Sequence, residues 1–263
     1  MTSDSSPSLR MLSTEEVNMS RFAFLLSNNA GLPGVKKDVA DMRSFLLSCE
    51  GGAWDTGEIL EKHKLSLSEL RVYLDEIRKM RFDYVLFYYS GHGSFMRGTM
   101  LEINEEGEKI SESETLGLSA KQLSIYDCCR YVPPTMIAKK FASVCENAQN
   151  VLGLRRKLSR SVFDSQVKAA PPQQIRLYAC KVGQFANATE SGSLYTQGLL
   201  SSAFVIGKQG GADPVSVHNA CANLVYLAST RCEHTQTPEC VSSVVSQGYV
   251  KLPFVIKSPG LVP

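Results

Sequence analysis

The first part of the chain alternates short apolar runs with amphipathic stretches. The run RFAFLLS, which begins at Arg21, and the run YVLFYYS over 84–90 are almost uninterrupted, as in strands that are buried on both faces of a parallel sheet. Between these runs, apolar residues recur at helical spacing over 35–49 and again over 66–80. A weakly signalled strand near 57–61 separates the two predicted helices. The alternation predicts a largely parallel sheet with helices on both faces.

The same alternation continues to the end of the chain. The further predicted elements are a hairpin around 104–107, a strand over 122–126, a helix over 135–147, a strand over 175–180, helices over 194–206 and 214–230, and a last strand over 244–252. The polar, Ser-rich residues 1–20 are predicted to form a flexible tail. We therefore expect one α/β domain over 21–263.

One segment departs from this pattern. Residues 150–173 carry five basic side chains against one acidic side chain, and they end in the sequence Ala-Ala-Pro-Pro. This composition predicts an exposed basic linker that divides the domain into an earlier and a later part.

Composition and charge exclude several classes of protein. The chain of 263 residues is 43% hydrophobic and 21% charged, as is ordinary for a globular domain, and its net charge of +2 gives no electrostatic reason to bind nucleic acid or an anionic membrane. No apolar run approaches the roughly 18 residues of a membrane-spanning helix, and the N-terminus lacks the apolar core of an export signal. The eight cysteines are therefore expected to be reduced thiols in a cytoplasmic protein. No CxxC or HExxH motif is present, and we predict no metal site.

The candidate chemistry lies after two successive strands of the predicted sheet. His92 stands between two glycines after the strand over 84–90, and Cys129 follows the strand over 122–126. Parallel strands end at the same edge of a sheet, so an imidazole and a thiol can meet there, the imidazole taking the thiol proton. The backbone N–H groups of Gly93 and Cys129 are candidates for an oxyanion hole.

These residues stand in motifs that resemble those of the caspase-like cysteine peptidases of family C14, which include metacaspases, paracaspases and bacterial orthocaspases. Residues 89–93, Tyr-Ser-Gly-His-Gly, resemble the histidine motif, and residues 127–130, Asp-Cys-Cys-Arg, resemble the nucleophile motif Asp-x-Cys. The arginine of the second motif is similar to that of paracaspases. Similarity to metacaspases also extends to residues 179–200 and to Leu32, Gly34 and Asp38, so that the resemblance spans roughly 21–250.

The resemblance implies an α/β fold, a three-layer α/β/α sandwich around a mostly parallel, mixed six-stranded sheet. Residues 21–149 would correspond to the large subunit of such enzymes and residues 174–263 to the small subunit. It also implies a Cys–His dyad in which His92 is the base and Cys129 the nucleophile, with no cofactor required. Cys128 is the competing thiol, although the motif favours Cys129. Cys180 follows a different strand and is interpreted as structural.

In metacaspases the pocket for the residue before the scissile bond is acidic, and the matching positions here are Asp38, Ser90 and Asp127. Two carboxylates and a hydroxyl suit arginine or lysine, and arginine can bind a carboxylate through two hydrogen bonds. We therefore expect the substrates to be polypeptides cleaved after Arg or Lys and not after Asp. The alternative is that Asp38 only lies on a solvated helix face.

The basic linker would then be a substrate of the enzyme itself. We predict self-cleavage within 155–168, and the alternative is an exposed loop that stays intact. The candidate positions are Arg155, Arg156, Lys157, Arg160 and Lys168.

Three further alternatives stay open at this point. Glutamates over 102–114 allow calcium activation, but they lack EF-hand spacing and also suit a plain exposed hairpin. The main rival function is a caspase-like scaffold domain without catalysis. A Cys-dependent acyl transferase or a separase-like enzyme would have a similar site. No motif identifies a regulatory partner.

Overall fold

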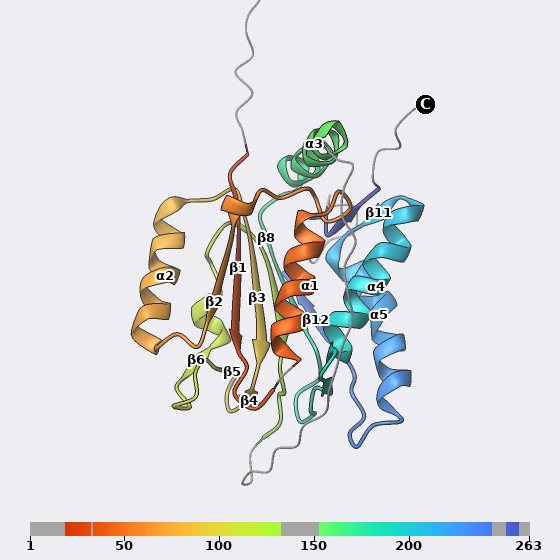
Figure 1. Ribbon diagram of the computed structural model, residues 1–263. Helices are drawn as coiled ribbons and strands as arrows, with labels where there is room; N and C mark the ends of the chain where they lie inside the picture. Colours follow the sequence, from red (N-terminus) through yellow and green to blue (C-terminus); the bar gives the residue numbers. More distant parts are fainter. Residues whose placement is uncertain (1–18, 33, 133–152, 244–250, 258–263) are drawn as a thin grey trace, which may run out of the picture.

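The computed structural model describes residues 19–32, 34–132, 153–243 and 251–257. At its centre lies a six-stranded sheet in the order β12-β8-β7-β3-β1-β2 (Figure 1). All neighbouring pairs are parallel except β12 with β8. The mostly parallel, mixed six-stranded sheet is thus confirmed. Its strands are β1 (Arg21–Asn28), β2 (Ile59–His63), β3 (Tyr84–Gly91), β7 (Lys121–Asp127), β8 (Gln173–Tyr178) and β12 (Glu239–Ser242).

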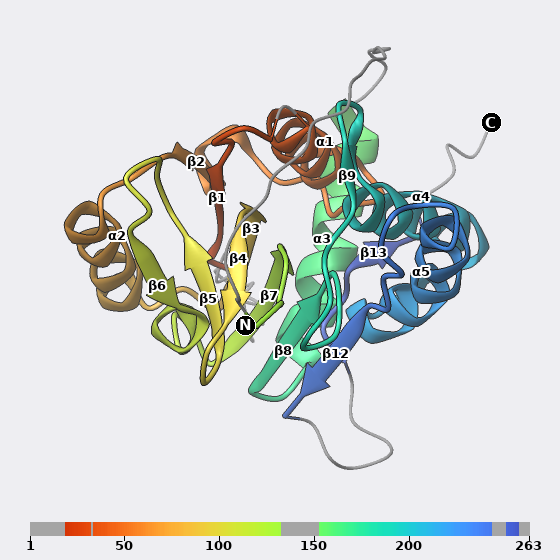
Figure 2. The same ribbon diagram turned by 90° about the horizontal axis from the view of Figure 1, so that it is seen from below.

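Helices cover both faces of this sheet. On one face lie α1 (Val35–Leu47), α4 (Leu194–Gln209) and α5 (Pro214–Ser229), and on the other lies α2 (Leu67–Met80) (Figure 2). The central strand β3 supplies both cores, because its side chains alternate between the two faces. Tyr84, Leu86 and Tyr88 pack in the core beneath α1 and α4, whereas Val85, Phe87 and Tyr89 pack in the core beneath α2. This is the predicted α/β/α sandwich.

Smaller sheets decorate the ends of the main one. The predicted hairpin is present as β5 (Thr99–Glu102) and β6 (Lys109–Ser111), and β4 (Gly93–Phe95) joins it as a third antiparallel strand. Short two-residue strands form two further pairs. They are β9 (Ala188–Thr189) with β10 (Gly192–Ser193), and β11 (Gly211–Ala212) with β13 (Val255–Ile256). Two 3-10 turns, η1 (Thr56–Glu58) and η2 (Glu112–Thr115), complete the described elements.

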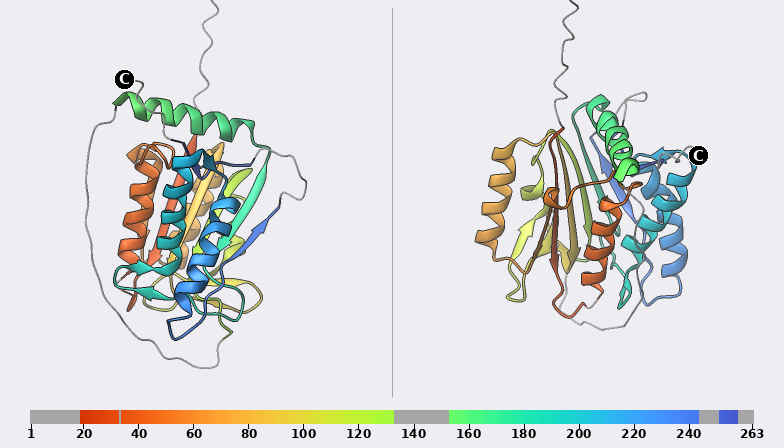
Figure 3. Two further views of the ribbon diagram at one scale, coloured as in Figure 1. Left: turned by 90° about the vertical axis from the view of Figure 1, so that its right-hand side faces the viewer. Right: turned by 45° about the horizontal axis from the view of Figure 1, so that its top comes forward.

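The prediction of an exposed linker over 150–173 is wrong, because most of this segment forms the helix α3 (Gly153–Ala169). Ser159, Phe163 and Val167 recur at a spacing of four and are buried, while the basic residues occupy the rest of the helix surface. The five basic residues dominated the composition of the segment, so the apolar stripe was not recognised in the sequence. The helix lies across the end of the sheet at which the parallel strands begin (Figure 3).

Two other predicted elements cannot be compared fully. The helix expected over 135–147 lies outside the described residues, and so does most of the strand expected over 244–252. The last described strand of the main sheet is β12, which ends at Ser242, before that predicted range.

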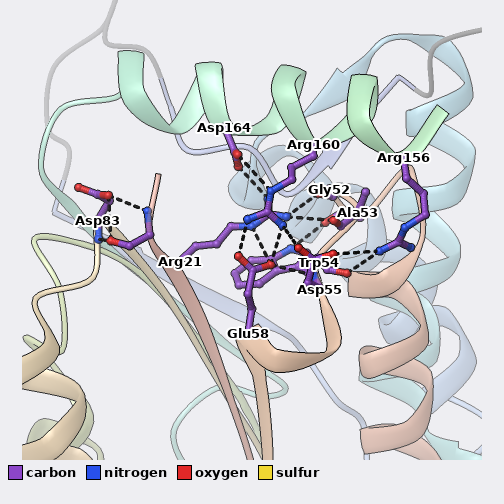
Figure 4. Close-up of polar contacts among 12 residues, drawn as sticks. Arg21, Gly52, Ala53, Trp54, Asp55, Glu58, Asp83, Arg156, Arg160 and Asp164 are labelled. Carbon is purple, nitrogen blue, oxygen red and sulfur yellow. Dashed lines mark hydrogen bonds and ion pairs between the residues drawn. The ribbon is translucent and has the colours of Figure 1, made fainter. Parts of the chain in front are cut away.

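A buried arginine joins α3 to the start of β1. The guanidinium of Arg21 donates to Asp164 at 2.9 Å and to the carbonyls of Gly52 and Ala53 at 2.9 and 3.1 Å (Figure 4). It also lies 4.5 Å from the centre of the Trp54 ring. Three segments that are distant in the sequence, β1, the loop after α1 and α3, therefore meet on one buried cation.

Replacing Arg21 by alanine is expected to destabilise the protein strongly. The change removes a buried cation that contacts two carbonyls and Asp164, although Arg160 still pairs with Asp164. Breaking such a buried arrangement costs about 3–5 kcal/mol. The matched control is Arg43→Ala, which breaks an ion pair with Glu61 whose side chains are 35% and 29% exposed. This control should cost at most about 1 kcal/mol. Denaturant unfolding measures both, and equal losses would contradict the structural role of Arg21.

Candidate active site

The two motif loops lie side by side because β3 and β7 are neighbours in the sheet. Ser90 pairs with Asp127 in the register of these strands, so the chain reaches His92 and Cys129 after the same number of residues on each side. The loops are in tight contact at Gly93. A Cβ added there would lie 2.7 Å from both the Cys128 sulfur and the Cys129 carbonyl oxygen. Glycine at this position therefore allows the backbone of the histidine loop to touch the nucleophile loop.

The ring of His92 is held in a defined tautomer. Its Nε2 lies 2.6 Å from the carbonyl oxygen of Ala30, in the loop after β1. A carbonyl oxygen only accepts hydrogen bonds, so Nε2 carries a proton, and in the neutral ring Nδ1 holds the lone pair. The backbone carbonyl of His92 is fixed as well, because it accepts from the Tyr89 hydroxyl at 2.7 Å and from the Glu102 N–H at 3.0 Å. His92 is thus oriented with one ring nitrogen available as a base.

Cys129 is a half-buried thiol whose hydrogen bonds go to the loop after β8. Its sulfur accepts from the N–H of Ala186 at 3.3 Å and donates to the Ala186 carbonyl at 3.9 Å. Burial raises the pKa of this thiol, and the nearby charge of Asp127 adds to the rise. Within the described part of the chain, no hydrogen bond joins the thiol to His92. The raised pKa keeps the cysteine protonated at neutral pH.

The competing thiols are less accessible than Cys129. Cys128 is buried against Gly93, and burial raises its pKa well above the usual range. Cys180 is also buried, and burial raises its pKa to about 12. The Cys180 thiol donates to the Cys128 carbonyl at 3.5 Å, so it lies directly behind the nucleophile loop. Of the three thiols, Cys129 belongs to the least buried residue.

The three residues expected to bind a basic side chain come together. Asp38 in the first turn of α1, Ser90 on β3 and Asp127 on β7 are all buried, and the Ser90 hydroxyl donates to Asp38 Oδ2 at 3.1 Å. Asp38 is only 1% exposed, so the alternative of a solvated helix face is wrong. Asp38 and Asp127, here called the carboxylate pair, thus lie beside the loop that carries Cys129.

The electrostatics of the carboxylate pair are unusual. Burial raises the pKa of Asp38 to about 8, and the neighbouring Asp127 contributes to this rise. Burial also raises the pKa of Asp127. Among the residues that the structure describes, no Arg, Lys or His side chain pairs with either carboxylate. Two acidic groups without a cation hold a proton at neutral pH, and they form a site that a positively charged group can complete.

The sequence did not reveal the partners of this pair in the second half of the chain. Ser193, which precedes α4, donates its hydroxyl to Asp127 and its backbone N–H to Asp38, the latter at 2.8 Å. Thr196 donates to the same oxygen of Asp127 at 2.5 Å. A serine before a predicted helix signals an N-cap, and Ser193 does accept from the Thr196 N–H at 2.9 Å. No local pattern could indicate partners that lie more than sixty residues away in the sequence.

Arg130 ties the nucleophile loop to the second half of the domain. Its guanidinium lies 3.9 Å from the centre of the Tyr178 ring and donates to the Cys180 carbonyl at 3.2 Å and to Glu239 at 2.5 Å. The backbone N–H of Arg130 donates to the Gln184 carbonyl at 3.0 Å. A buried, planar cation with this many partners holds the residue after Cys129 in one position.

The predicted self-cleavage positions lie far from Cys129. They belong to α3, at the beginning of the parallel strands, whereas the two motif loops follow the strand ends (Figure 1). Arg156 donates to the Leu47 carbonyl at 2.5 Å, and Arg160 pairs with Asp55 and Glu58. Helical, paired arginines do not present the extended backbone that a peptidase groove binds.

The described residues show no metal cluster, and glutamates of the hairpin over 102–114 form ion pairs. No group of three or more His, Cys, Asp or Glu side chains converges among them. Glu105 pairs with Lys64, and Glu114 pairs with Arg71. In the same part of the chain, no helix has the length and apolarity needed to cross a membrane.

Comparison with known proteins agrees with this fold. The family model described as a caspase domain matches residues 17–249. Caspase-1 from Spodoptera frugiperda has a similar structure, with a TM-score of 0.55 and 12% sequence identity over 85% of this chain and 86% of that one. No curated protein matches the chain. The fold and the family model together define a caspase domain, and the chain belongs to peptidase family C14. The identity to the insect caspase is low, so that likeness shows the fold alone.

Proposed function

We propose that this protein is a cysteine endopeptidase that cleaves polypeptides after Arg or Lys. The observation that carries the proposal is the carboxylate pair, which is buried and has no basic side chain paired with it among the described residues. One member of the pair, Asp127, stands two residues before Cys129 in the chain. A basic side chain seated there would bring its own carbonyl carbon to the nucleophile loop. Arginine would be preferred, because its planar fork can bridge two carboxylates.

In the proposed reaction, Nδ1 of His92 takes the proton of the Cys129 thiol as the sulfur attacks the substrate carbonyl. The N–H groups of Gly93 and Cys129 would stabilise the oxyanion. The imidazolium then gives its proton to the leaving amine, and water hydrolyses the acyl-enzyme. The hydrogen bond from Nε2 to Ala30 supports this assignment, because it leaves Nδ1 as the basic nitrogen.

One specific observation favours a scaffold without catalysis as a second candidate. The resting thiol of Cys129 is bonded to Ala186 and not to His92, and its pKa is raised and not lowered. A scaffold would need neither an oriented imidazole beside the nucleophile loop nor two buried carboxylates without a paired basic side chain, and the described residues contain both. Self-cleavage within 155–168 stays a prediction, and the helical state of α3 means that it would require this helix to unfold locally.

Matched peptides that differ only in the residue before the scissile bond test the proposal. We expect peptides with Arg or Lys at this position to be hydrolysed at least about a hundredfold faster than the peptide with Asp, because a third carboxylate would repel the pair. A thiol-reactive inhibitor ending in Arg should label Cys129. Preference for the peptide with Asp would overturn the proposed specificity. A folded protein that cleaves none of the peptides and whose Cys129 is not labelled would indicate the scaffold.

A further inference from the structure

Ser193, the N-cap of α4, donates hydrogen bonds to both members of the carboxylate pair. Ser193 offers two donors, one to each carboxylate: its N–H bonds Asp38 Oδ1 at 2.8 Å, and its hydroxyl bonds Asp127 Oδ2. A guanidinium that bridges two carboxylates also presents one donor to each. Thr196 adds a second hydroxyl to Asp127 Oδ2, and its own oxygen lies 2.8 Å from the Tyr88 hydroxyl. Neutral donors thus stand where a cation is expected.

These donors leave little of the pair open. Ser90 bonds Asp38 Oδ2 at 3.1 Å, and Ser193 bonds Asp38 Oδ1, so that both oxygens of Asp38 are taken. Oδ2 of Asp127 accepts from both Ser193 and Thr196. Asp38 is 1% exposed and Asp127 is 3% exposed. A basic side chain therefore cannot reach both carboxylates unless Ser193 gives up its contacts.

The segment before Ser193 is fitted tightly over Asp38. This segment is the β9–β10 hairpin, which lies beside the start of α1 (Figure 2). A Cβ on Gly192 would lie 2.5 Å from Asp38 Oδ1, and a Cβ on Gly34 would lie 2.0 Å from the Thr189 carbonyl oxygen. The hairpin strands have two residues each, so few backbone pairs hold them together. The hairpin is thus closely packed on the pair but short enough to shift locally.

We propose that Ser193, with Thr196, is a self-cap on the carboxylate pair, and that a basic substrate side chain binds by displacing Ser193. Ser193 is then a residue that sets the affinity for the basic side chain, although it takes no part in bond breaking. The inference rests on the proposed function, because it concerns the same pocket. It assigns the present structure to the capped, resting form of that pocket.

The test compares Ser193→Ala with Ser66→Ala. Each change removes the serine N-cap of a helix, at a typical cost of about 1 kcal/mol, but Ser66 caps α2, away from the pair. For a peptide cleaved after Arg, we expect Ser193→Ala to lower KM about tenfold with little change in kcat, because one competing hydrogen bond to a charged group is lost. Ser66→Ala should leave KM unchanged. Binding of benzamidine, a simple amidinium ligand, should tighten in parallel for Ser193→Ala.

Hydrogen exchange of the unaltered protein supplies a second measurement, in case Ser193→Ala folds poorly. Saturating benzamidine should speed exchange of the Ser193 N–H, since its bond to Asp38 must break. If wild type cleaves after Arg but the KM of Ser193→Ala stays the same or rises, the self-cap is wrong. Unchanged exchange in the presence of bound benzamidine leads to the same conclusion. If wild type does not cleave after Arg at all and binds no benzamidine, the proposed function itself fails.

Discussion

Replacing Cys129 by alanine is expected to reduce hydrolysis of an Arg-containing peptide by at least about a thousandfold, because the sulfur that forms the acyl-enzyme is lost. His92→Ala should cause a loss of similar size, and the double variant should lose little more, since the two residues act as a unit. The measurement is kcat with the peptide at saturation. Substrate binding should persist in Cys129→Ala, because the carboxylate pair is untouched.

Cys128→Ala supplies the matched control for this prediction. Both cysteines lie in the same loop, but Cys128 is buried against Gly93 and its raised pKa keeps it protonated. We expect Cys128→Ala to keep most of the activity, with some loss from the cavity that it leaves next to the histidine loop. The reverse result, with Cys128→Ala inactive and Cys129→Ala active, would move the nucleophile by one residue and contradict the assignment.

The second large effect is expected from Asp38→Asn, which should stabilise the fold while weakening hydrolysis after Arg. In the folded protein Asp38 holds its proton to about pH 8, against an ordinary value of 3.8. Between these pH values the folded state binds more protons than the unfolded state, so this group makes stability fall as pH rises. The slope approaches about 1.4 kcal/mol per pH unit, and asparagine abolishes it.

Thermal and denaturant unfolding from pH 5 to pH 8 checks this sign. Asp38→Asn should lose less stability than wild type over that range and be the more stable protein at pH 8. Asp41→Asn is the control on the same helix, because Asp41 pairs with Lys37 and contributes least of the causes that raise the pKa of Asp38, so it should show a far smaller effect. If Asp38→Asn were less stable than wild type at pH 8, the folded protein would not disfavour the ionised form of Asp38.

The proton held by Asp38 should also affect the KM for a substrate with Arg before the scissile bond. A basic side chain competes with the proton on the pair, so KM for an Arg peptide should fall as pH rises from 6 to 8, by at most about tenfold per unit. Asp38→Asn should raise KM for this peptide by about a hundredfold, since only one carboxylate can then ionise to face the bound cation. It should change hydrolysis of a peptide with a neutral residue before the scissile bond far less. If Asp38→Asn kept full preference for Arg, the pair would not be the substrate pocket.

Much of the fold follows from local patterns. The buried strands β1 and β3 are almost uninterrupted apolar runs, and the short mixed segment over 122–126 indicated β7. The helices α1, α2, α4 and α5 carry their apolar residues at helical spacing. The segment over 153–169 was misjudged for a physical reason. Its buried stripe consists of only three residues, and Arg160 looks solvated until the fold places the carboxylates of Asp55 and Glu58 beside it.

The candidate site, like the fold, was predicted from the sequence only in part. The sequence by itself determined that a histidine and a cysteine follow two successive strands, because hydrophobic periodicity and glycine spacing are local properties of the chain. Only the tertiary structure decided that Asp38 is buried, that no cation accompanies the carboxylate pair within the described residues, and that Ser193 covers it. Burial and the displacement of a pKa depend on what packs against a group, and here the packing partners come from opposite ends of the domain.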